Sequence, residues 1–293
     1  MKPIVKWAGG KTKLLPELLA RVPDAIGTYV EPFAGGAALF FALADAAALG
    51  QKRRRFERAI LADKNADLVA CYRAVRDDVE AVISALAPFK YDRELYYEVR
   101  AQDPQKMSDV ARAARLLFLN RTCYNGLWRV NSKGRFNVPF GKYTNPRISD
   151  PESLREASQL LKGVEIVHGD FATVTAGLGR GDFVYFDPPY VPVSRTADFT
   201  AYAADRFGAE EQSRLRDLLL ALRKKKIAAM LSNADTPETR ALYADLHVEV
   251  VRAPRSISRD GAKRSDIDEL VVSTLPASSR RRAPSAAARG ARE

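Results

Sequence analysis

Four consecutive residues, Asp187-Pro188-Pro189-Tyr190, follow a short apolar run, and their types suit one particular chemistry. An exocyclic amine on a nucleobase is a poor nucleophile because its lone pair is delocalised into the ring. A carboxylate and a backbone carbonyl held side by side accept the two amine hydrogens, and proline supplies a fixed φ and a carbonyl with no competing N–H. Tyr190 then offers a ring on which an extruded base stacks. The alternative is a rigid Pro-Pro turn without a chemical role.

A second segment, Glu31-Pro32-Phe33-Ala34-Gly35-Gly36-Ala37, indicates a ligand-binding turn between a strand and a helix. Glycines let a ligand approach the backbone closely, and a helix N-terminus favours an anionic group. Asp63 ends the next expected strand, where an acid commonly binds ribose hydroxyls. The segment lacks the G-x-G-x-x-G spacing of a dinucleotide site, and a Gly-Gly turn is often only a turn.

A third segment, Lys6-Trp7-Ala8-Gly9-Gly10-Lys11-Thr12, superficially resembles a loop that binds nucleotide triphosphates. That motif requires its first glycine where this chain has Val5, so the interpretation fails. What remains is a basic turn with an aromatic residue and glycines. This segment alone does not indicate a function.

These residues need a scaffold, and short β-rich runs alternating with helical stretches indicate an α/β sheet. The expected strands are Tyr29–Val30, Ala59–Ala62, Val164–Val167, Phe183–Phe186, Ile227–Ser232, Val248–Val251 and Leu270–Thr274. Four of them lead into loops that carry an acidic residue, namely Glu31, Asp63, Asp170 and Asp187. Because ligands bind outside the carboxyl ends of the strands in open α/β sheets, we expect these acids to converge on one crevice.

Between Asp63 and Val164 the alternation gives way to a helical region and then to a basic, aromatic segment. We therefore expect a catalytic domain formed by residues 1–66 and 160–275, and an inserted domain formed by residues 67–159. Residues 133–141 resemble a hairpin turn and its outgoing strand. Residues 276–293 are rich in Arg, Ser, Ala and Pro, and we expect them to be a disordered basic tail.

The composition favours a polyanion as partner. The formal net charge is +11 over 293 residues, and each Lys or Arg placed on a phosphate releases condensed counterions. The apolar runs are shorter than the roughly 20 residues that a membrane helix needs, and the N-terminus lacks the apolar core of a secretory signal, so we expect a cytoplasmic protein. Isolated cysteines and histidines predict neither a zinc site nor a disulfide framework.

Four separated segments resemble, in this order, the Dam family of DNA adenine methyltransferases. They are Lys6–Lys11, Glu31–Gly36, Asn125–Arg129 with Asn137–Gly141, and Asp187–Tyr190. The resemblance runs from about Val5 to Thr274, with further likeness at Phe199–Tyr202, Ser232–Asn233 and Arg255–Ser258. It implies a Rossmann-like sheet of the S-adenosylmethionine-dependent methyltransferases, with an inserted, mainly helical DNA-recognition domain that carries a β-hairpin.

The resemblance also implies roles for individual residues. The expected catalytic residues are Asp187, Pro188, Pro189 and Tyr190. The residues expected around S-adenosylmethionine are Trp7, Lys11, Glu31, Phe33, Gly35, Asp63, Asp170, Phe171 and Asp187. The residues expected at the DNA are Lys6, Tyr124, Asn125, Leu127, Arg129, Pro139 and Tyr143. Among these, Arg129 suits a guanine edge and Leu127 suits the thymine methyl of a GATC site.

The implied reaction is a direct displacement, in which adenine N6, extruded from double-stranded GATC, attacks the methyl group of S-adenosylmethionine. The protein contributes positioning and oriented hydrogen bonds, and this chemistry does not require magnesium or another metal. The enzyme is expected to act as a monomer.

Other functions stay open. An RNA adenine methyltransferase or a DNA methylase with a different site has the same fold and chemistry. Trp128 and Val130 depart from the family pattern, and we expect them to alter packing or phosphate contacts more than the sequence that is read. Enzymes that modify cytosine N4 or protein glutamine more often begin the tetrapeptide with Asn or Ser, so Asp187 favours adenine. A non-catalytic DNA-binding relative is expected to have lost Asp187 or the Gly-Gly turn. Mismatch repair, restriction-modification and phage biology are all open as the biological role.

Overall fold

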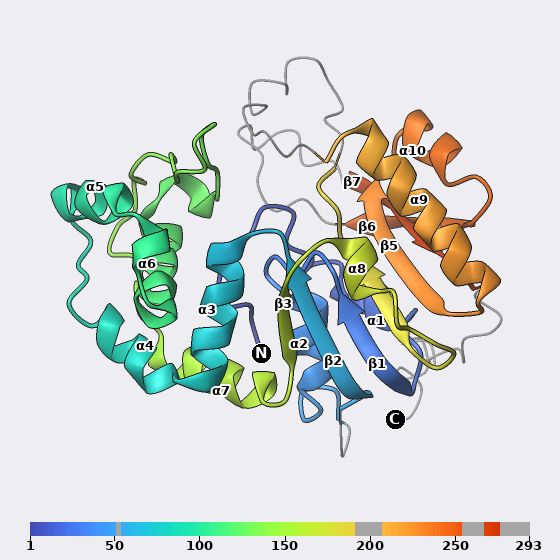
Figure 1. The fold of residues 1–293 in the computed structure, drawn as a ribbon, viewed down its shortest axis with the longest axis horizontal. Helices are drawn as coiled ribbons and strands as arrows, with labels where there is room; N and C mark the ends of the chain where they lie inside the picture. The colour runs from blue at the N-terminus through green and yellow to red at the C-terminus, as the bar shows by residue number, and fades with distance from the viewer. Residues whose placement is uncertain (51–53, 191–206, 254–266, 276–293) are drawn as a thin grey trace, which may run out of the picture.

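A seven-stranded sheet runs through the computed structural model, which describes residues 1–50, 54–190, 207–253 and 267–275 (Figure 1). The sheet order is β3-β2-β1-β4-β5-β7-β6. The strands are β1 (Ile26–Glu31), β2 (Phe56–Asp63), β3 (Glu165–His168), β4 (Phe183–Phe186), β5 (Ala228–Ala234), β6 (His247–Ala253) and β7 (Ile267–Ser273). The expected α/β class is confirmed. Phe199–Tyr202, Arg255–Ser258 and the tail 276–293 lie outside the described residues.

Of the seven strands of this sheet, β7 runs opposite to the others. β3, β2, β1, β4 and β5 are parallel to their neighbours, whereas β7 pairs antiparallel with both β5 and β6. From β1 the chain adds β2 and β3 on one side, and from β4 it adds β5 on the other. The strand order therefore reverses between β1 and β4, which is where open α/β sheets bind their ligands.

Helices cover both faces of the sheet (Figure 1). They include α1 (Leu15–Leu19), α2 (Ala38–Ala44), α8 (Phe171–Val174), α9 (Ala209–Lys224) and α10 (Pro237–Leu242). In α9 the buried residues Leu215, Leu219 and Leu222 recur at helical spacing and pack in one apolar cluster with Phe186 of β4 and Leu231 of β5. This apolar stripe fixes α9 against the sheet beside the end of β4.

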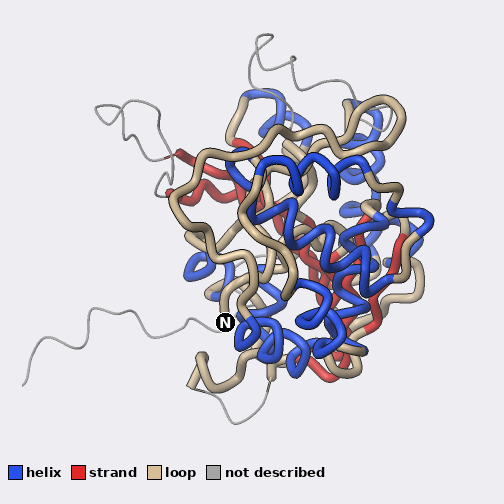
Figure 2. The backbone as a smooth tube through the Cα atoms, turned by 90° about the vertical axis from the view of Figure 1, so that its left-hand side faces the viewer, coloured by secondary structure: helices blue, strands red, loops and turns tan. Residues whose placement is uncertain are grey.

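The segment between β2 and β3 is mainly helical, as expected. It contains α3 (Ala66–Asp77), α4 (Val79–Leu86), α5 (Arg93–Ala101), η1 (Pro104–Lys106), α6 (Asp109–Thr122), η2 (Tyr124–Gly126) and α7 (Pro151–Leu161). Figures 1 and 2 show these helices gathered beside β3, at one end of the molecule. One cluster of buried side chains extends from Leu61 of β2 through Tyr72 of α3 to Phe118 of α6. The helical part and this half of the sheet therefore share one hydrophobic core.

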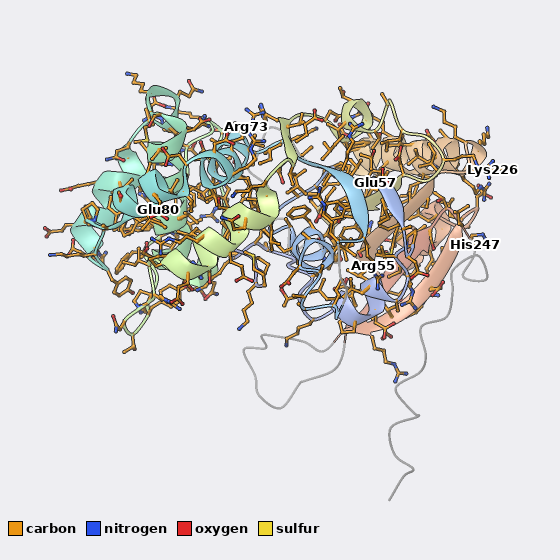
Figure 3. All side chains as sticks on the ribbon, turned by 90° about the horizontal axis from the view of Figure 1, so that it is seen from below. Arg55, Glu57, Arg73, Glu80, Lys226 and His247 are labelled. Carbon is orange, nitrogen blue, oxygen red and sulfur yellow. The ribbon has the colours of Figure 1, made fainter. Side chains whose placement is uncertain are left out.

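Arginines of α3 attach the helical part to the edge of the sheet. Arg73 donates to the Ile166 carbonyl at 2.9 and 2.7 Å, and Arg76 donates to the Val164 carbonyl at 2.7 Å. Figure 3 places Arg73 at the junction and Glu80 farther out, where its carboxylate binds Arg155 of α7. Lys226 and His247 mark the opposite end of the molecule. Charge-assisted bonds to strand carbonyls hold α3 in a fixed place beside β3.

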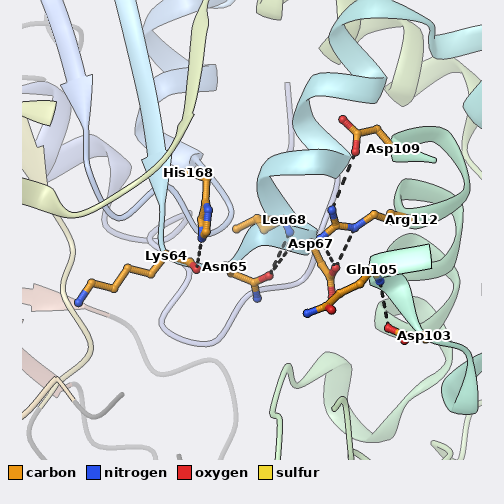
Figure 4. A network of polar contacts seen from close by, with 9 residues as sticks. All are labelled: Lys64, Asn65, Asp67, Leu68, Asp103, Gln105, Asp109, Arg112 and His168. Atoms are coloured by element: carbon orange, nitrogen blue, oxygen red, sulfur yellow. Dashed lines mark hydrogen bonds and ion pairs between the residues drawn. The ribbon is translucent and has the colours of Figure 1, made fainter. Parts of the chain in front are cut away.

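A polar network at the end of β2 continues this connection (Figure 4). The Asn65 side chain accepts from the N–H groups of Asp67 and Leu68 and so caps α3, as expected for a helix N-cap. Arg112 of α6 donates to Asp67 at 2.7 Å, and His168 Nε2 lies 3.0 Å from the Lys64 carbonyl. The network links the loop after Asp63 to the helical part.

The expected hairpin is less regular than predicted. A turn closes through the Gly134 N–H to the Asn131 carbonyl and the Asn131 N–H to the Arg135 carbonyl. Its flanks pair only through the isolated bridges Val130–Phe136 and Cys123–Phe140. Pro139 lacks an N–H to contribute to a ladder, which limits regular pairing on the outgoing side. The segment is a hairpin turn on an irregular loop.

No helix in the described ranges is long and apolar enough to cross a membrane.

Candidate active site

The carboxyl ends of three adjacent strands border one large cavity. Glu31 ends β1, Asp63 ends β2 and Asp187 follows β4. All three line a cavity of about 1160 Å³. The expected convergence on one crevice is found for these three acids, because β1 lies between β2 and β4 in a parallel arrangement. Asp170, which follows β3, was expected to join them but lies outside the cavity wall.

The cavity gathers most of the residues singled out from the sequence. Those in its wall are Lys6, Trp7, Lys11, Glu31, Phe33, Gly35, Asp63, Asn125, Arg129, Asp187, Pro188, Pro189 and Tyr190. Those outside its wall are Tyr124, Leu127, Pro139, Tyr143, Asp170 and Phe171. The wall also contains residues that sequence reasoning did not select, among them Asn65, Trp128, Tyr185 and Phe207.

Asp187 is held by a buried lysine. The Lys11 ammonium lies 2.9 Å from Asp187 Oδ1, with the lysine side chain 4% exposed and the aspartate 21% exposed to the cavity. Lys11 also donates to the Gly9 carbonyl and lies 4.8 Å from the centre of the Tyr190 ring. Burial raises the pKa of Asp187 to about 6, although Lys11 opposes the rise. The carboxylate is the form that Lys11 favours.

The rest of the Pro-Pro turn is held from two sides. Tyr190 donates its hydroxyl to Glu269 of β7 at 3.0 Å, and Gln212 of α9 donates to the Pro189 carbonyl at 3.3 Å. Burial and the nearby carboxylates raise the pKa of Tyr190, so the hydroxyl keeps its proton and remains a donor. The turn therefore presents Asp187 and the Tyr190 ring in a fixed arrangement.

Glu31 is a buried carboxyl at the floor of the cavity, 2% exposed. It accepts a hydrogen bond from the Tyr29 hydroxyl at 2.8 Å. Burial, together with the charges of Asp187 and Asp63, raises the pKa of Glu31 to about 8, while the hydrogen bond from Tyr29 opposes the rise. Glu31 is therefore prepared for a cationic or hydrogen-bonding ligand group, which would relieve the repulsion among the three acids.

Asp63 holds the glycine turn at Gly35 through hydrogen bonds to backbone N–H groups. It accepts the Gly35 N–H at 3.0 Å and the Asn65 N–H at 2.8 Å. Burial raises the pKa of Asp63 although these N–H groups lower it. Gly35 has φ of +45°, and a Cβ there would lie 2.7 Å from Cδ1 of Trp7. Only glycine lets Trp7 close over this turn.

The aromatic residues near the end of β3 form two layers. Phe33 faces the cavity and packs on Phe171 with ring centroids 5.5 Å apart, while Phe207 meets Phe33 edge-on at 5.3 Å. Phe171 itself is 1% exposed behind Phe33. Asp170 caps α8 through the Ala172 N–H and pairs with Arg214 at 3.0 Å. The structure therefore places Phe171 behind Phe33, and it places Asp170 outside the cavity wall.

The residues expected at the DNA lie beside the cavity mouth. Tyr124 and Leu127 are 46% and 40% exposed. Arg129 is exposed at the cavity rim and donates to the Asn137 side chain at 2.8 Å. Pro139 is exposed and Tyr143 is half-buried beneath Lys6, whose ammonium lies 4.7 Å from the Tyr143 ring centre. This group forms a surface next to the opening.

Two residues outside the expected catalytic, donor-binding and DNA-binding sets join the cavity to this surface. Trp128, expected from the sequence to alter packing or phosphate contacts, stacks on Trp7 with ring centroids 6.1 Å apart. Asn120, at the end of α6, bonds to both Lys6 and Gly126. No sequence pattern pairs Asn120 with a residue as distant as Lys6. The sequence did offer one signal, because an asparagine within an apolar helical run needs a hydrogen-bond partner when it is buried.

No group of three or more His, Cys, Asp or Glu residues in the described ranges is arranged to hold a metal ion.

The sheet order and the acid-lined cavity at the β1/β4 reversal define a Rossmann-like α/β fold with a ligand site at the reversal. The model of the D12 class N6 adenine-specific DNA methyltransferases matches residues 7–257. The chain belongs to this family, and it is an adenine-specific DNA methyltransferase. The resemblance to the Dam family is thereby confirmed.

Relatives that match along nearly the whole chain support the assignment. The type II methyltransferase M1.LlaDCHI of Lactococcus lactis subsp. cremoris is 39% identical over 93% of this chain and 95% of its own length. The type II methyltransferase M.MjaIII of Methanocaldococcus jannaschii is 39% identical over 93% and 98%. The DNA adenine methylase of Escherichia coli K12 is 35% identical over 94% and 96%.

Proposed function

We propose that the enzyme methylates adenine N6 in double-stranded GATC, that S-adenosylmethionine is the methyl donor, and that the target base leaves the duplex to react. The observation that carries the proposal is the pairing of Asp187 with Lys11 at the cavity floor, beside Tyr190. A carboxylate so placed accepts an amine hydrogen, and the tyrosine ring borders the space that a base would enter.

The cavity suits S-adenosylmethionine, which the family implies. Pockets for small molecules usually measure about 300–1,000 Å³, and this cavity of about 1160 Å³ leaves room for an adenine base as well. Glu31 and Asp63 provide acceptors for amine and ribose groups, and Phe33 provides an aromatic wall. When bound, this donor supplies a methyl group activated by a positively charged sulfur.

The chain's own contribution is orientation. Asp187 and the Pro188 carbonyl accept the two N6 hydrogens, which turns the nitrogen lone pair out of the ring plane. Lys11 keeps Asp187 ionised, and Tyr190 stacks on the base while Glu269 fixes its hydroxyl. Interactions of this kind accelerate reaction because they are already in place when charge develops.

The exposed surface beside the cavity suits the reading of a short DNA site. Arg129 at the rim has the planar donor group that binds guanine O6 and N7, and Leu127 is exposed for a thymine methyl. Lys6, Tyr124, Asn125, Pro139 and Tyr143 surround them. We assign residues 67–159 as the recognition domain and residues 1–66 with 160–275 as the catalytic domain.

The test is expression in a bacterium that lacks adenine methylation, followed by mapping of N6-methyladenine in its DNA. Modification confined to GATC is expected. Modification at another sequence would keep the chemistry and contradict the GATC assignment. Unmodified DNA together with methylated adenine in RNA would favour the RNA enzyme instead.

A further inference from the structure

Asn120 is a buried side chain that bonds two loops at once. Its Oδ1 accepts the Lys6 N–H at 2.7 Å, and its Nδ2 donates to the Lys6 carbonyl at 2.7 Å and to the Gly126 carbonyl at 3.1 Å. The residue is fully buried at the end of α6. The amide oxygen and both amide N–H groups are thus used to hold residues 4–11, called here the N-terminal loop, against residues 124–130, called here the recognition loop.

A second contact joins the same loops on the cavity side. Trp7 and Trp128 stack with centroids 6.1 Å apart and planes 20° apart, and both rings line the cavity. Phe136 supports Trp128 from behind at 4.6 Å. Gly126 has φ of +64°, and a Cβ there would lie 2.7 Å from Cδ of Lys6. The two loops are therefore in close contact along their length.

Each loop serves a different ligand. The N-terminal loop carries Trp7 and Lys11 at the cavity, next to Asp187. The recognition loop carries Leu127 and Arg129 at the surface proposed to read DNA. Apart from the short η2 turn, neither loop has regular secondary structure. Contacts with each other and with α6 are among those that hold both loops in place.

We propose that Asn120 and Trp128 are positioning residues that form a latch between the two loops, and that this latch couples methyl-donor binding to DNA-site recognition. The proposal rests on the function proposed above. A ligand that orders one loop also orders its latched partner, so the second ligand binds a surface that is already arranged. The coupling is positive, and it is the same whichever ligand binds first.

The experiment measures the Kd of S-adenosylmethionine, alone and with a saturating duplex that the wild-type enzyme methylates. Titrations use the full chain and the non-reactive product S-adenosylhomocysteine as a parallel probe. The ratio of the two Kd values is expected to be on the order of 5- to 150-fold in the wild type. In Asn120→Ala and Trp128→Ala this ratio is expected to fall below about twofold.

Two variants provide controls. Trp128→Phe retains an aromatic ring on Trp7 and is expected to retain most of the coupling. Leu127→Ala removes an exposed side chain of the same loop that has no part in the latch, so it weakens DNA binding and leaves the ratio unchanged. Trp7 and Trp128 are the only tryptophans of the chain. Near-ultraviolet circular dichroism therefore reports directly on their stacking.

A wild-type ratio of one would overturn the latch, and so would an unchanged ratio in Trp128→Ala. Trp128 is only half-buried, so this variant decides the question even if Asn120→Ala does not fold. The duplex is chosen by the activity of the wild type. If the GATC assignment is wrong, a duplex with the correct site is used, and the test of the latch is unaffected.

Discussion

The Lys11 ammonium contacts Asp187 Oδ1 at 2.9 Å, and this ion pair joins the first of the sequence segments to the last. Lys11 comes from the N-terminal loop, whereas Asp187 follows β4 in the middle of the sheet. Because both side chains border the same cavity, the pair determines the charge of the group proposed to hold the target amine.

Lys11→Met is expected to move the acid limb of the kcat–pH profile to higher pH. The pKa of Asp187 is about 6, and Lys11 lowers it. Loss of one nearby opposite charge raises a carboxyl pKa by about 1–3 units. Activity therefore falls near neutral pH and recovers as pH rises. Lys13→Met, two residues away and exposed, should keep the wild-type profile; an unshifted limb in Lys11→Met would contradict the role of the pair.

Glu31→Gln is expected to change how stability depends on pH. The pKa of Glu31 is about 8 in the folded protein, above its ordinary value of 4.5. The folded state therefore binds this proton more tightly than the unfolded state, and stability decreases as pH rises between these values. The contribution is about 1.4 kcal/mol per pH unit. Urea unfolding at several pH values should show this slope reduced in Glu31→Gln, and an equal slope in both proteins would refute the assignment.

Gly35→Ala is expected to weaken binding of S-adenosylmethionine on the order of tenfold, because its Cβ would displace Trp7. The matched control is Gly163→Ala, which has φ of +74° and open space around the new Cβ. Both variants bear the backbone cost of about 1–2 kcal/mol for the left-handed conformation. Isothermal titration should therefore separate them: similar affinity in the two variants would show that Trp7 does not need the glycine.

Arg129→Ala is expected to lose about 1–3 kcal/mol of discrimination between GATC and a site altered at a guanine. Arg135→Ala, at the exposed turn of the same hairpin, is expected to weaken all duplexes alike and to reduce the salt dependence of binding. Competition binding with paired duplexes at two salt concentrations distinguishes the two effects. If Arg129→Ala lost the same affinity for every duplex, Arg129 would not be a residue that reads a base.

The sequence was sufficient for the scaffold and the floor of the site. Apolar runs ending in Glu31, Asp63 and Asp187 predicted three strands, and parallel neighbours necessarily bring such ends together. It did not show that Phe171 would lie behind Phe33, since adjacent aromatic residues do not reveal which one faces a cavity.

The contacts that the sequence missed are long-range ones. Asn120 and Lys6 are 114 positions apart, and Tyr190 and Glu269 are 79 positions apart. No local sequence pattern links partners that are so far apart in the chain. These hydrogen bonds depend on how α6 and β7 pack against the rest of the protein. Trp128 was expected to alter packing or phosphate contacts, and the sequence did not show that it would stack on Trp7 in the cavity wall. The expected hairpin turn is present, but two isolated bridges take the place of a regular ladder beside it.

The most direct test of the central claim is methyl transfer from labelled S-adenosylmethionine to two duplexes that differ only in carrying GATC or GTTC. It is run with the wild type and with Asp187→Asn, and donor binding is measured separately. Label recovered as N6-methyladenine in the GATC duplex alone, with turnover reduced by about 10²-fold or more in Asp187→Asn despite retained donor binding, is the predicted result. Equal labelling of both duplexes, or normal turnover in the variant, would contradict it.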